Sequence, residues 1–408
     1  MRLFHLSDLH LGKNFRGYDL LEDQAYVLDR VVEALAERKP SLMIIAGDVY
    51  DRAIPPLGAI ACFDAFLRAA VEAVPGMRIV IIPGNHDSSG RLAFGSAFMA
   101  DSGIDIVTEL RKEPILLRDI DAPPQEGGAP WAAVWALPFL TQLISDWSAE
   151  GQPRMLSQDE MMRRAVGAIK DAINVGSDPL LSLPGHESQS LGSAPTVKIL
   201  AAHCFAAGAV ASESETSFVG AAEQVDVGAF AGFDYVALGH LHKSQSPAPA
   251  AWYSGSPMAY SMGEAGAEKG YLEVELGDPP LVRFIRIKPL RELRKIRGYF
   301  RDLADNPLPE AERGDYIEAT LLDGEPVPNA GERLKAMYPR LVGTNQECYK
   351  RKLEESAPGA VDRESLDPLS ALTQDFERFH NEIRGEDPEP KMAALFAQLA
   401  REALNEAE

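Results

Sequence analysis

Short apolar runs alternate with amphipathic stretches along the first hundred residues of the chain. Leu3–Leu6, Leu42–Ala46 and Arg78–Ile82 have the length and apolar content of buried strands. Between them, apolar residues recur at helical spacing over Glu22–Glu37 and Asp64–Ala73. Strands that alternate with helices in this way predict an α/β fold, with a mainly parallel sheet covered by helices.

Two further apolar runs follow after a loop-rich interruption. Residues 122–130 and 176–195 are dense in proline, glycine and serine and predict surface excursions. Lys198–Ala202 and Tyr235–Leu238 then have the pattern of strands. We therefore expect the strand-rich domain to continue past the interruption.

The pattern changes near residue 282. A smaller segment follows, about residues 290–345, with one strand-like run at Tyr316–Leu322, and two apolar stripes near the C-terminus predict amphipathic helices. We expect three parts, 1–281, 282–345 and 346–408. The stripes consist of Leu369, Leu372, Phe376 and Phe379, and of Met392, Leu395, Phe396, Leu399 and Ala403.

Net charge at first disfavours a nucleic-acid partner. The 408-residue chain has a formal net charge of −21, and phosphates repel carboxylates. From residue 302 onward, acidic residues outnumber basic ones two to one, so more than half of the excess lies there. The charge therefore weakens a DNA-binding interpretation without excluding it.

The cysteines and apolar runs bear on cellular location. Cys62, Cys204 and Cys348 lie far apart and form no CxxC pair, which argues against a disulfide framework or a thiolate zinc cage. The chain starts in MRLFHLSDLH, without a recognisable targeting segment, and no apolar run approaches the ~20 residues of a membrane span. We expect a cytoplasmic protein with no membrane association.

Polar residues of the kinds that bind metal ions follow each predicted strand. They are Asp8, His10, Asp48, Asn85, His203, His240 and His242. A single DxH pair, or a histidine after a strand, is a ligand in roughly one case in ten and otherwise a turn or core residue. The ordered set DxH, GDxxD, GNHD, H and GHxH rarely arises by chance. Carboxylate, amide and imidazole ligands suit manganese, iron or zinc, and seven fit two ions that share one carboxylate.

This order of motifs resembles the calcineurin-like metallophosphoesterase superfamily, whose fold is a sandwich of two facing β-sheets flanked by helices. Within it, FHLSDLHLGK, IPGNHDS and WYSGSPMAYSMGE are similar to segments of bacterial DNA nuclease subunits that work with a coiled-coil ATPase. The resemblance covers nearly the whole chain. It implies a metallophosphoesterase catalytic domain, a smaller α+β capping domain and C-terminal helices.

The resemblance also implies two divalent ions, with Mn²⁺ expected. Asp8, His10, Asp48 and His242 would hold the first, and Asp48, Asn85, His203 and His240 the second. A hydroxide activated by both ions would attack phosphorus. His86 would contact the phosphate and protonate the leaving oxygen as a general acid.

One position departs from the family pattern. Some nucleases of this type carry a second catalytic histidine three residues after the bridging aspartate, where this chain has Asp51. We hypothesise that Asp51 accepts a hydrogen bond from His86, orients its ring and keeps it protonated.

Basic residues near these motifs are candidate DNA contacts, with an ordinary solvated role equally open. They are Lys13, Arg16, Arg52, Arg91 and Lys243, together with the polar Asn14. Residues 283–301 carry eight basic residues and one acidic residue, which fits either phosphate binding or a salt-bridged edge strand.

For the whole protein, the resemblance implies a manganese-dependent nuclease. The expected activities are 3′-to-5′ degradation of double-stranded ends and endonucleolytic cutting of single strands or hairpins. ATP hydrolysis would come from the partner, because the chain has no GxxxxGK[ST] loop. The C-terminal helices would dock on the coiled coil of this ATPase, although packing onto the chain's own catalytic domain is equally open, and a homodimer within a heterotetramer is implied.

Two alternatives differ in substrate or class. A protein phosphatase or cyclic-nucleotide phosphodiesterase of the same superfamily would use the same ligands, but does not need the long segment after residue 282. A metal-stabilised scaffold without catalysis is disfavoured because His86 and every ligand are present.

Overall fold

A computed structural model describes residues 1–117, 132–141, 156–174, 197–210, 224–277, 279–349, 368–384 and 387–406. The loop-rich stretches expected at 122–130 and 176–195 lie outside these residues. The chain forms two compact units, Met1–Thr320 with Asn329–Asn345, and Leu321–Pro328 with Gln346–Glu408.

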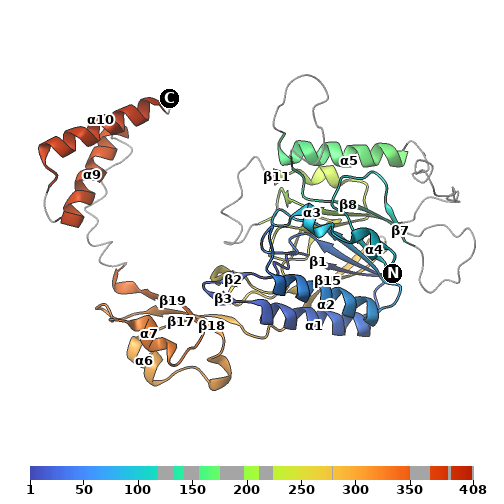
Figure 1. The fold of residues 1–408 in the computed structure, drawn as a ribbon, viewed down its shortest axis with the longest axis horizontal. Coiled ribbons are helices and arrows are strands. Elements are labelled where there is room, and N and C mark those ends of the chain that lie inside the picture. The colour runs from blue at the N-terminus through green and yellow to red at the C-terminus, as the bar shows by residue number, and fades with distance from the viewer. Residues whose placement is uncertain are drawn as a thin grey trace, which may run out of the picture. The chain divides into compact units, whose positions relative to one another are not determined.

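Two six-stranded sheets face each other in the first unit (Figure 1). In the first sheet, of order β16-β15-β1-β4-β5-β6, the last four strands are parallel, and β15 is antiparallel to both of its neighbours, β1 and β16. Its strands are β1 (Arg2–Leu6), β4 (Leu42–Ala46), β5 (Arg78–Ile82), β6 (Ile104–Ile106), β15 (Gly270–Glu275) and β16 (Leu281–Arg286).

The second sheet repeats this plan. Its order is β13-β14-β12-β9-β8-β7, with four parallel central strands and an antiparallel strand at each edge. Its strands are β7 (Ile115–Leu117), β8 (Ala132–Leu137), β9 (Val197–His203), β12 (Tyr235–Gly239), β13 (Gln245–Ala248) and β14 (Ala251–Tyr253).

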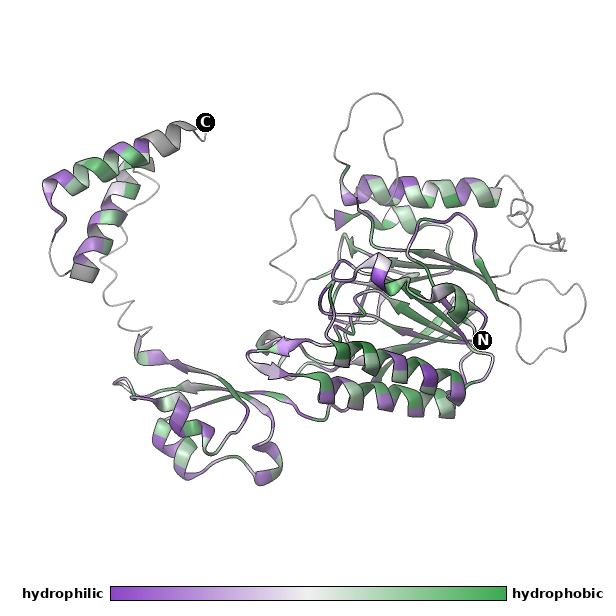
Figure 2. Cartoon of the chain, viewed as in Figure 1, coloured by the Kyte–Doolittle hydropathy of each residue, from purple (hydrophilic) through white to green (hydrophobic). Residues whose placement is uncertain are grey.

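Each central strand is buried on both faces. In β4, Leu42, Ile44 and Ala46 pack between the sheets, whereas Met43 and Ile45 pack under the helices. Double burial explains why the sequence of this strand is a continuous apolar run rather than an alternating one. In Figure 2 the strands between the helix layers are coloured mainly as hydrophobic.

Helices cover both outer faces of the sandwich (Figure 1). Helices α1 (Leu21–Arg38) and α2 (Leu57–Ala73) pack on the first sheet, and α5 (Gln158–Asn174) packs on the second. The expected fold, two facing sheets flanked by helices, is confirmed. Short elements complete the domain: β2 (Asn14–Phe15), β3 (Tyr18–Asp19), α3 (Ser89–Leu92), α4 (Ser96–Ala100), β10 (Phe205–Ala206) and β11 (Gln224–Val225).

Two of the expected elements differ from those in the structure. Helix α2 begins at Leu57, seven residues before the expected start, because Pro56 caps it in extended conformation and its first turns carry exposed residues without an apolar stripe. The first sheet continues to Arg286 because β16 pairs with β15, and the division of the chain near residues 281 and 345 stays a prediction. The segment after it holds three strands rather than one.

This smaller segment is a sheet with two short helices. Its strands are β17 (Leu293–Gly298), β18 (Tyr316–Leu321) and β19 (Leu341–Gln346), and its helices are α6 (Phe300–Asp305) and α7 (Ala330–Lys335). A polar cluster joins it to α1: the buried Asp23 accepts hydrogen bonds from Arg291 at 2.8 Å and from the Tyr316 hydroxyl at 2.9 Å.

The predicted C-terminal helices are α9 (Pro368–Arg384) and α10 (Pro390–Glu406). The rings of Phe376 and Phe396 stack between them, with centroids 4.1 Å apart and planes 6° apart. Among the described residues, no helix combines the length and apolar content that crossing a membrane requires.

Candidate metal centre

The candidate ligands gather where parallel strands of both sheets end. Asp8 and His10 follow β1, Asp48 follows β4, and Asn85 follows β5, while His203 ends β9 and the GHLH segment begins at the end of β12. Ligands collect at the carboxyl ends of strands in parallel sheets because the loops there converge. All seven residues, from five segments of sequence, therefore meet in one place.

The backbone around these ligands is unusual. Asp8, His10, Asp48 and His240 have positive φ, from 43° to 108°. Side chains other than glycine rarely adopt this conformation, which costs on the order of 1 kcal/mol or more per residue. Such strain persists only where the surrounding structure holds it, and here it turns successive polar side chains toward one point.

Two buried carboxylates tie the loops together. Asp8 accepts the main-chain N–H of His240 at 3.0 Å, and Asp48 accepts that of His86 at 2.9 Å. Both are at most 2 % exposed. Each carboxylate therefore fixes a second ligand-bearing loop while its remaining oxygen lone pairs face the site.

Asp8, His10 and His242 form one potential ion site. Their ligand atoms lie within 4.8 Å of one another. His10 Nε2 and His242 Nε2 face each other at 3.1 Å, a spacing that two imidazoles on one ion would have if each lay about 2.0–2.1 Å from it.

A second cluster lies around His203. Its Nε2 is 3.4 Å from Asp48 Oδ2 and 3.0 Å from Asn85 Oδ1, and His240 Nδ1 reaches the same amide oxygen at 3.0 Å. Asn85 is exposed, whereas Asp48 and His203 are buried. The amide side of this cluster therefore opens to solvent.

The pKa shifts of His203 and Asp48 show that the site favours a positive charge. Burial opposes a charged His203, but the Asp48 carboxylate wins and raises the pKa of His203 to about 9. Burial would raise the pKa of the Asp48 carboxyl, but His203 chiefly lowers it well below its usual range. His203 Nδ1 donates to the Ala46 carbonyl at 2.8 Å, so the extra proton sits on Nε2, toward Asp48 and Asn85. A proton thus holds the position that a metal ion would take, and the donor set fits divalent metal.

Three motif glycines allow this close approach. An ideal Cβ on Gly47 would lie 2.2 Å from His203 Nδ1, one on Gly84 2.1 Å from Asp48 Oδ1, and one on Gly239 1.8 Å from the Ala46 carbonyl oxygen. Real Cβ atoms essentially never come nearer than 3.0 Å to such atoms. The glycines that precede Asp48, Asn85 and His240 therefore make room for ligands or for the groups that orient them.

His86 lies beside this centre, half-buried, with its ring 4.8 Å from that of His10. Its Nδ1 is 3.0 Å from the main-chain oxygen of Asp51, which can only accept, so Nδ1 donates. Our hypothesis assigned this orientation to the Asp51 side chain, and the correction is that the main chain supplies it. The carboxylate instead pairs with Lys13 at 2.7 Å and lies 3.7 Å from His10 Nδ1.

Two supporting groups carried no role in the sequence analysis. Asp87 accepts the main-chain N–H groups of Val49, Tyr50 and Gly84 and so joins the GDVYD and GNHD loops. Burial, with the nearby Asp48 charge, raises the pKa of Asp87 to about 6. Glu264 lies against His242. Its only sequence signal is the YSGSPMAYSMGE segment, which carries the family resemblance but does not mark Glu264 as a partner of His242.

The six candidate DNA contacts differ in surroundings. Asn14 Oδ1 accepts the Gly17 N–H and closes the β2–β3 turn. Arg16 is bound to Glu318 at 2.7 Å, and Arg91 donates to the Ala53 carbonyl at 3.3 Å. Lys13, Arg52 and Lys243 lie beside the ligand-bearing loops, Arg52 and Lys243 with exposed side chains and Lys13 half-buried.

The basic stretch 283–301 is largely ion-paired. Arg283 and Arg286, on the edge strand β16, bind Glu275 and Glu268. Further pairs are Arg291 with Glu22 and Asp23, Arg294 with Glu312 and Asp315, and Arg301 with Asp305. Of the two interpretations, the structure favours the salt-bridged edge strand, although four of the seven acidic partners lie before residue 283 rather than in the acidic region after residue 302.

Comparison with known proteins agrees with this site. Residues 1–244 match the calcineurin-like phosphoesterase family, and residues 289–383 match a domain described as the type 5 capsule protein repressor C-terminal domain. The chain is 28 % identical, over 392 residues, to the SbcD subunit of the nuclease SbcCD of Staphylococcus saprophyticus subsp. saprophyticus. That alignment covers 95 % of this chain and 94 % of the relative.

A solved structure is also similar, more distantly. The crystal structure of TT1561 from Thermus thermophilus shares 13 % identity, covering 70 % of this chain and 99 % of that one, with a TM-score of 0.37. The family assignment rests on the sequence matches.

Proposed function

Because this chain belongs to the calcineurin-like phosphoesterase family, we propose that it is a metal-dependent DNA nuclease subunit that hydrolyses phosphodiester bonds. The observation that carries the proposal is the convergence of seven ligand-type residues and His86 at one end of the sandwich. The substrate class comes from the nuclease subunit that the chain matches over 95 % of its length.

The proposal divides the seven candidate ligands between two ions. Asp8, His10, Asp48 and His242 would hold the first, and Asp48, Asn85, His203 and His240 the second. Bound divalent ions, for which we propose Mn²⁺, supply Lewis-acid charge and make a nucleophile from water at neutral pH. Because Asn85 is exposed and His240 half-buried, the second ion would lie nearer to solvent, where a phosphodiester would enter.

His86 suits the general acid of this reaction. The Asp51 carbonyl fixes its Nδ1 as a donor, so Nε2 is the nitrogen left to hold and release a proton. Transfer of that proton to the departing sugar oxygen neutralises the charge that bond cleavage leaves there. Asp51 itself positions Lys13, and Lys13, Arg52 and Lys243 are the candidate DNA phosphate contacts.

The C-terminal helix pair suits a protein partner, for which we propose a coiled-coil ATPase. The stacked Phe376 and Phe396 hold α9 against α10, while Phe379, Leu395 and Leu399 are each more than half exposed. Apolar side chains at helical spacing that remain exposed are typical of a helix-binding surface. The matched relative is itself named as one subunit of a complex. The smaller α+β segment would act as the capping domain.

A second exposed apolar group suits the proposed homodimer. Ile54, Leu57, Phe94 and Phe98 are 70 %, 85 %, 86 % and 83 % exposed. They flank the loops after the second and third ligand motifs, which the Arg91–Ala53 hydrogen bond holds together. Large apolar residues concentrated beside one site favour association of two copies.

Cleavage of a labelled hairpin duplex with manganese tests the proposal. The chain is assayed with and without a coiled-coil ATPase subunit, beside Asp48→Ala and beside bis-p-nitrophenyl phosphate. Cleavage of both substrates that Asp48→Ala abolishes would support a nuclease with this metal centre. Hydrolysis of the small ester alone, even with the ATPase present, would refute DNA as the substrate and favour another phosphoester.

A further inference from the structure

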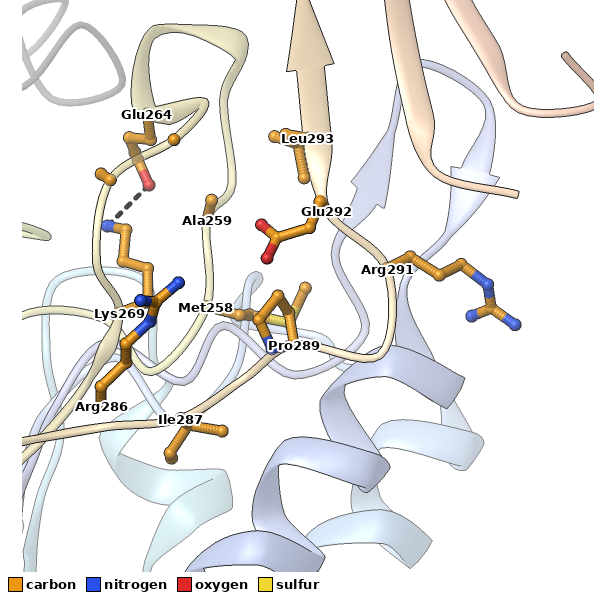
Figure 3. Close-up of a pocket in the computed structure, with 12 residues that line it drawn as sticks. Met258, Ala259, Glu264, Lys269, Arg286, Ile287, Pro289, Arg291, Glu292 and Leu293 are labelled. Atoms are coloured by element: carbon orange, nitrogen blue, oxygen red, sulfur yellow. Dashed lines mark ion pairs between the residues drawn. The ribbon is translucent and has the colours of Figure 1, made fainter. Parts of the chain in front are cut away.

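The outer side of His242 faces a buried ion pair. Glu264, 5 % exposed, places Oε1 3.3 Å from His242 Nδ1 and Oε2 2.8 Å from Lys269 Nζ. Figure 3 shows the pair side by side at the edge of a small pocket between the segment 258–269 and residues 286–293. With a cavity volume of about 20 Å³, the pocket has room for about one water molecule, so it does not suit a ligand.

Lys269 is fully satisfied in this position. Its ammonium group has three protons, and three acceptors surround it: Glu264 Oε2, the His242 carbonyl oxygen at 2.8 Å and Ser256 Oγ at 2.9 Å. The lysine therefore holds both the main chain of His242 and the carboxylate that faces its ring. Gly255, with φ of 75°, lets the SGSP loop pack against residues 242–244, where a Cβ would come within 2.7 Å of the Ser244 nitrogen.

We propose that Glu264, held by Lys269, is a positioning residue that fixes the proton of His242 on Nδ1, so that Nε2 is unprotonated and can bind a metal ion. A carboxylate only accepts hydrogen bonds, so Nδ1 must donate to it. Nε2, which faces His10 Nε2 at 3.1 Å, then presents its lone pair to the site. The inference rests on the proposed two-metal function and adds a residue pair that neither binds the ion nor touches substrate.

Replacing Glu264 with glutamine should reverse this arrangement. Lys269 and the Tyr260 N–H, which is 3.1 Å from Oε2, both need an acceptor at that position. The glutamine must therefore place its oxygen there and its NH₂ group toward His242. An NH₂ donor makes Nδ1 the acceptor and moves the ring proton to Nε2, where the metal should bind.

The test uses the full chain and two measurements. Ring ¹⁵N shifts of histidine-labelled, metal-free protein report the tautomer of His242, and calorimetric titration reports Mn²⁺ affinity. In wild type we expect the proton on Nδ1, and in Glu264→Gln on Nε2, with one ion bound about 10–100-fold more weakly. Glu268→Gln is the matched control, because Glu268 lies on the same segment, pairs with an arginine and is exposed. It should match wild type in both measurements.

A double variant separates positioning from charge balance. Glu264→Leu with Lys269→Met removes both charges and leaves no buried ion alone, so it tests the idea even if Glu264→Gln fails to fold. If it binds manganese as wild type does, Glu264 only neutralises Lys269 and the proposal is wrong. An unchanged tautomer in Glu264→Gln would also overturn it. A wild-type chain that bound no manganese would refute the two-metal site, while the metal-free tautomer would still decide the role of Glu264.

Discussion

Gly84→Ala should remove metal binding by displacing the bridging carboxylate. Gly84 is not among the positive-φ residues, so alanine brings no backbone strain, and only the added methyl group matters. Its Cβ would lie 2.1 Å from Asp48 Oδ1 and 2.4 Å from the Asp48 main-chain nitrogen. Either the carboxylate or the loop that carries it must move.

The required displacement exceeds what a metal site tolerates. To reach the 3.0 Å limit for real Cβ contacts, the oxygen must retreat by about 0.9 Å, whereas ligand distances hold to about ±0.2 Å. Asp48 is the candidate ligand shared by both ions, so the binding of both ions should weaken. Misplacing a group that only orients a ligand lowers metal affinity by about 10–100-fold. We therefore expect a loss of at least about 100-fold for a shared ligand, which is about 2.7 kcal/mol.

Calorimetric titration with Mn²⁺ measures this loss, and thermal melting shows whether the variant folds. Gly90→Ala is the matched control: it lies six residues along, outside the positive-φ region, and its Cβ would meet nothing within 4 Å. It should bind as wild type does. Wild-type affinity in a folded Gly84→Ala would refute the argument that Asp48 Oδ1 must stay in place to hold the ions.

Three further outcomes are expected. His86→Gln should keep Mn²⁺ affinity but lower the turnover of DNA by about 10²–10⁴-fold. The loss of turnover on bis-p-nitrophenyl phosphate should be smaller, because its leaving group needs little protonation. Equal losses on both substrates would contradict a role of His86 as general acid. Without metal, the folded pKa of His203 is about 9, above the ordinary value of about 6.5. Its pairing with Asp48 therefore stabilises the protein fully below pH 6.5, and this stabilisation is lost as pH rises toward 9. The pairing contributes at most about 3 kcal/mol to the free energy of unfolding. A melting temperature of the metal-free protein that stays flat over this window would contradict the pairing. Asp23→Ala should lower the free energy of urea unfolding by about 1–3 kcal/mol because it leaves a buried partner without its acceptor. Glu22→Ala removes a carboxylate that binds the same arginine but is 70 % exposed, and should change that free energy by no more than about 0.5 kcal/mol. Equal effects would argue against the polar cluster as the connection between the smaller segment and α1.

Local pattern was enough to identify the strands and the ligand-bearing loops. β4 and β5 begin and end at the predicted residues because continuous apolar runs of four or five residues are typical of strands in a doubly buried sheet. The ligand types and their order after each strand are also local, and the topology of a parallel sheet brings such loops to one edge. The sequence pattern by itself therefore determined the parallel strands and the candidate ligands that follow them, while the arrangement in two facing sheets was implied by the family resemblance.

Only the tertiary structure decided which groups orient the ligands. Glu264 lies 22 residues from His242, and His86 is held by the main chain of Asp51 rather than by its side chain. Arg291 likewise pairs with a residue of α1 more than 260 positions away, which gives this part of the basic stretch a structural role. A hydrogen bond between loops from distant parts of the chain forms or is lost when the distance between its two atoms changes by a few tenths of an ångström. Residue type and spacing along the sequence do not encode those distances, which packing alone sets.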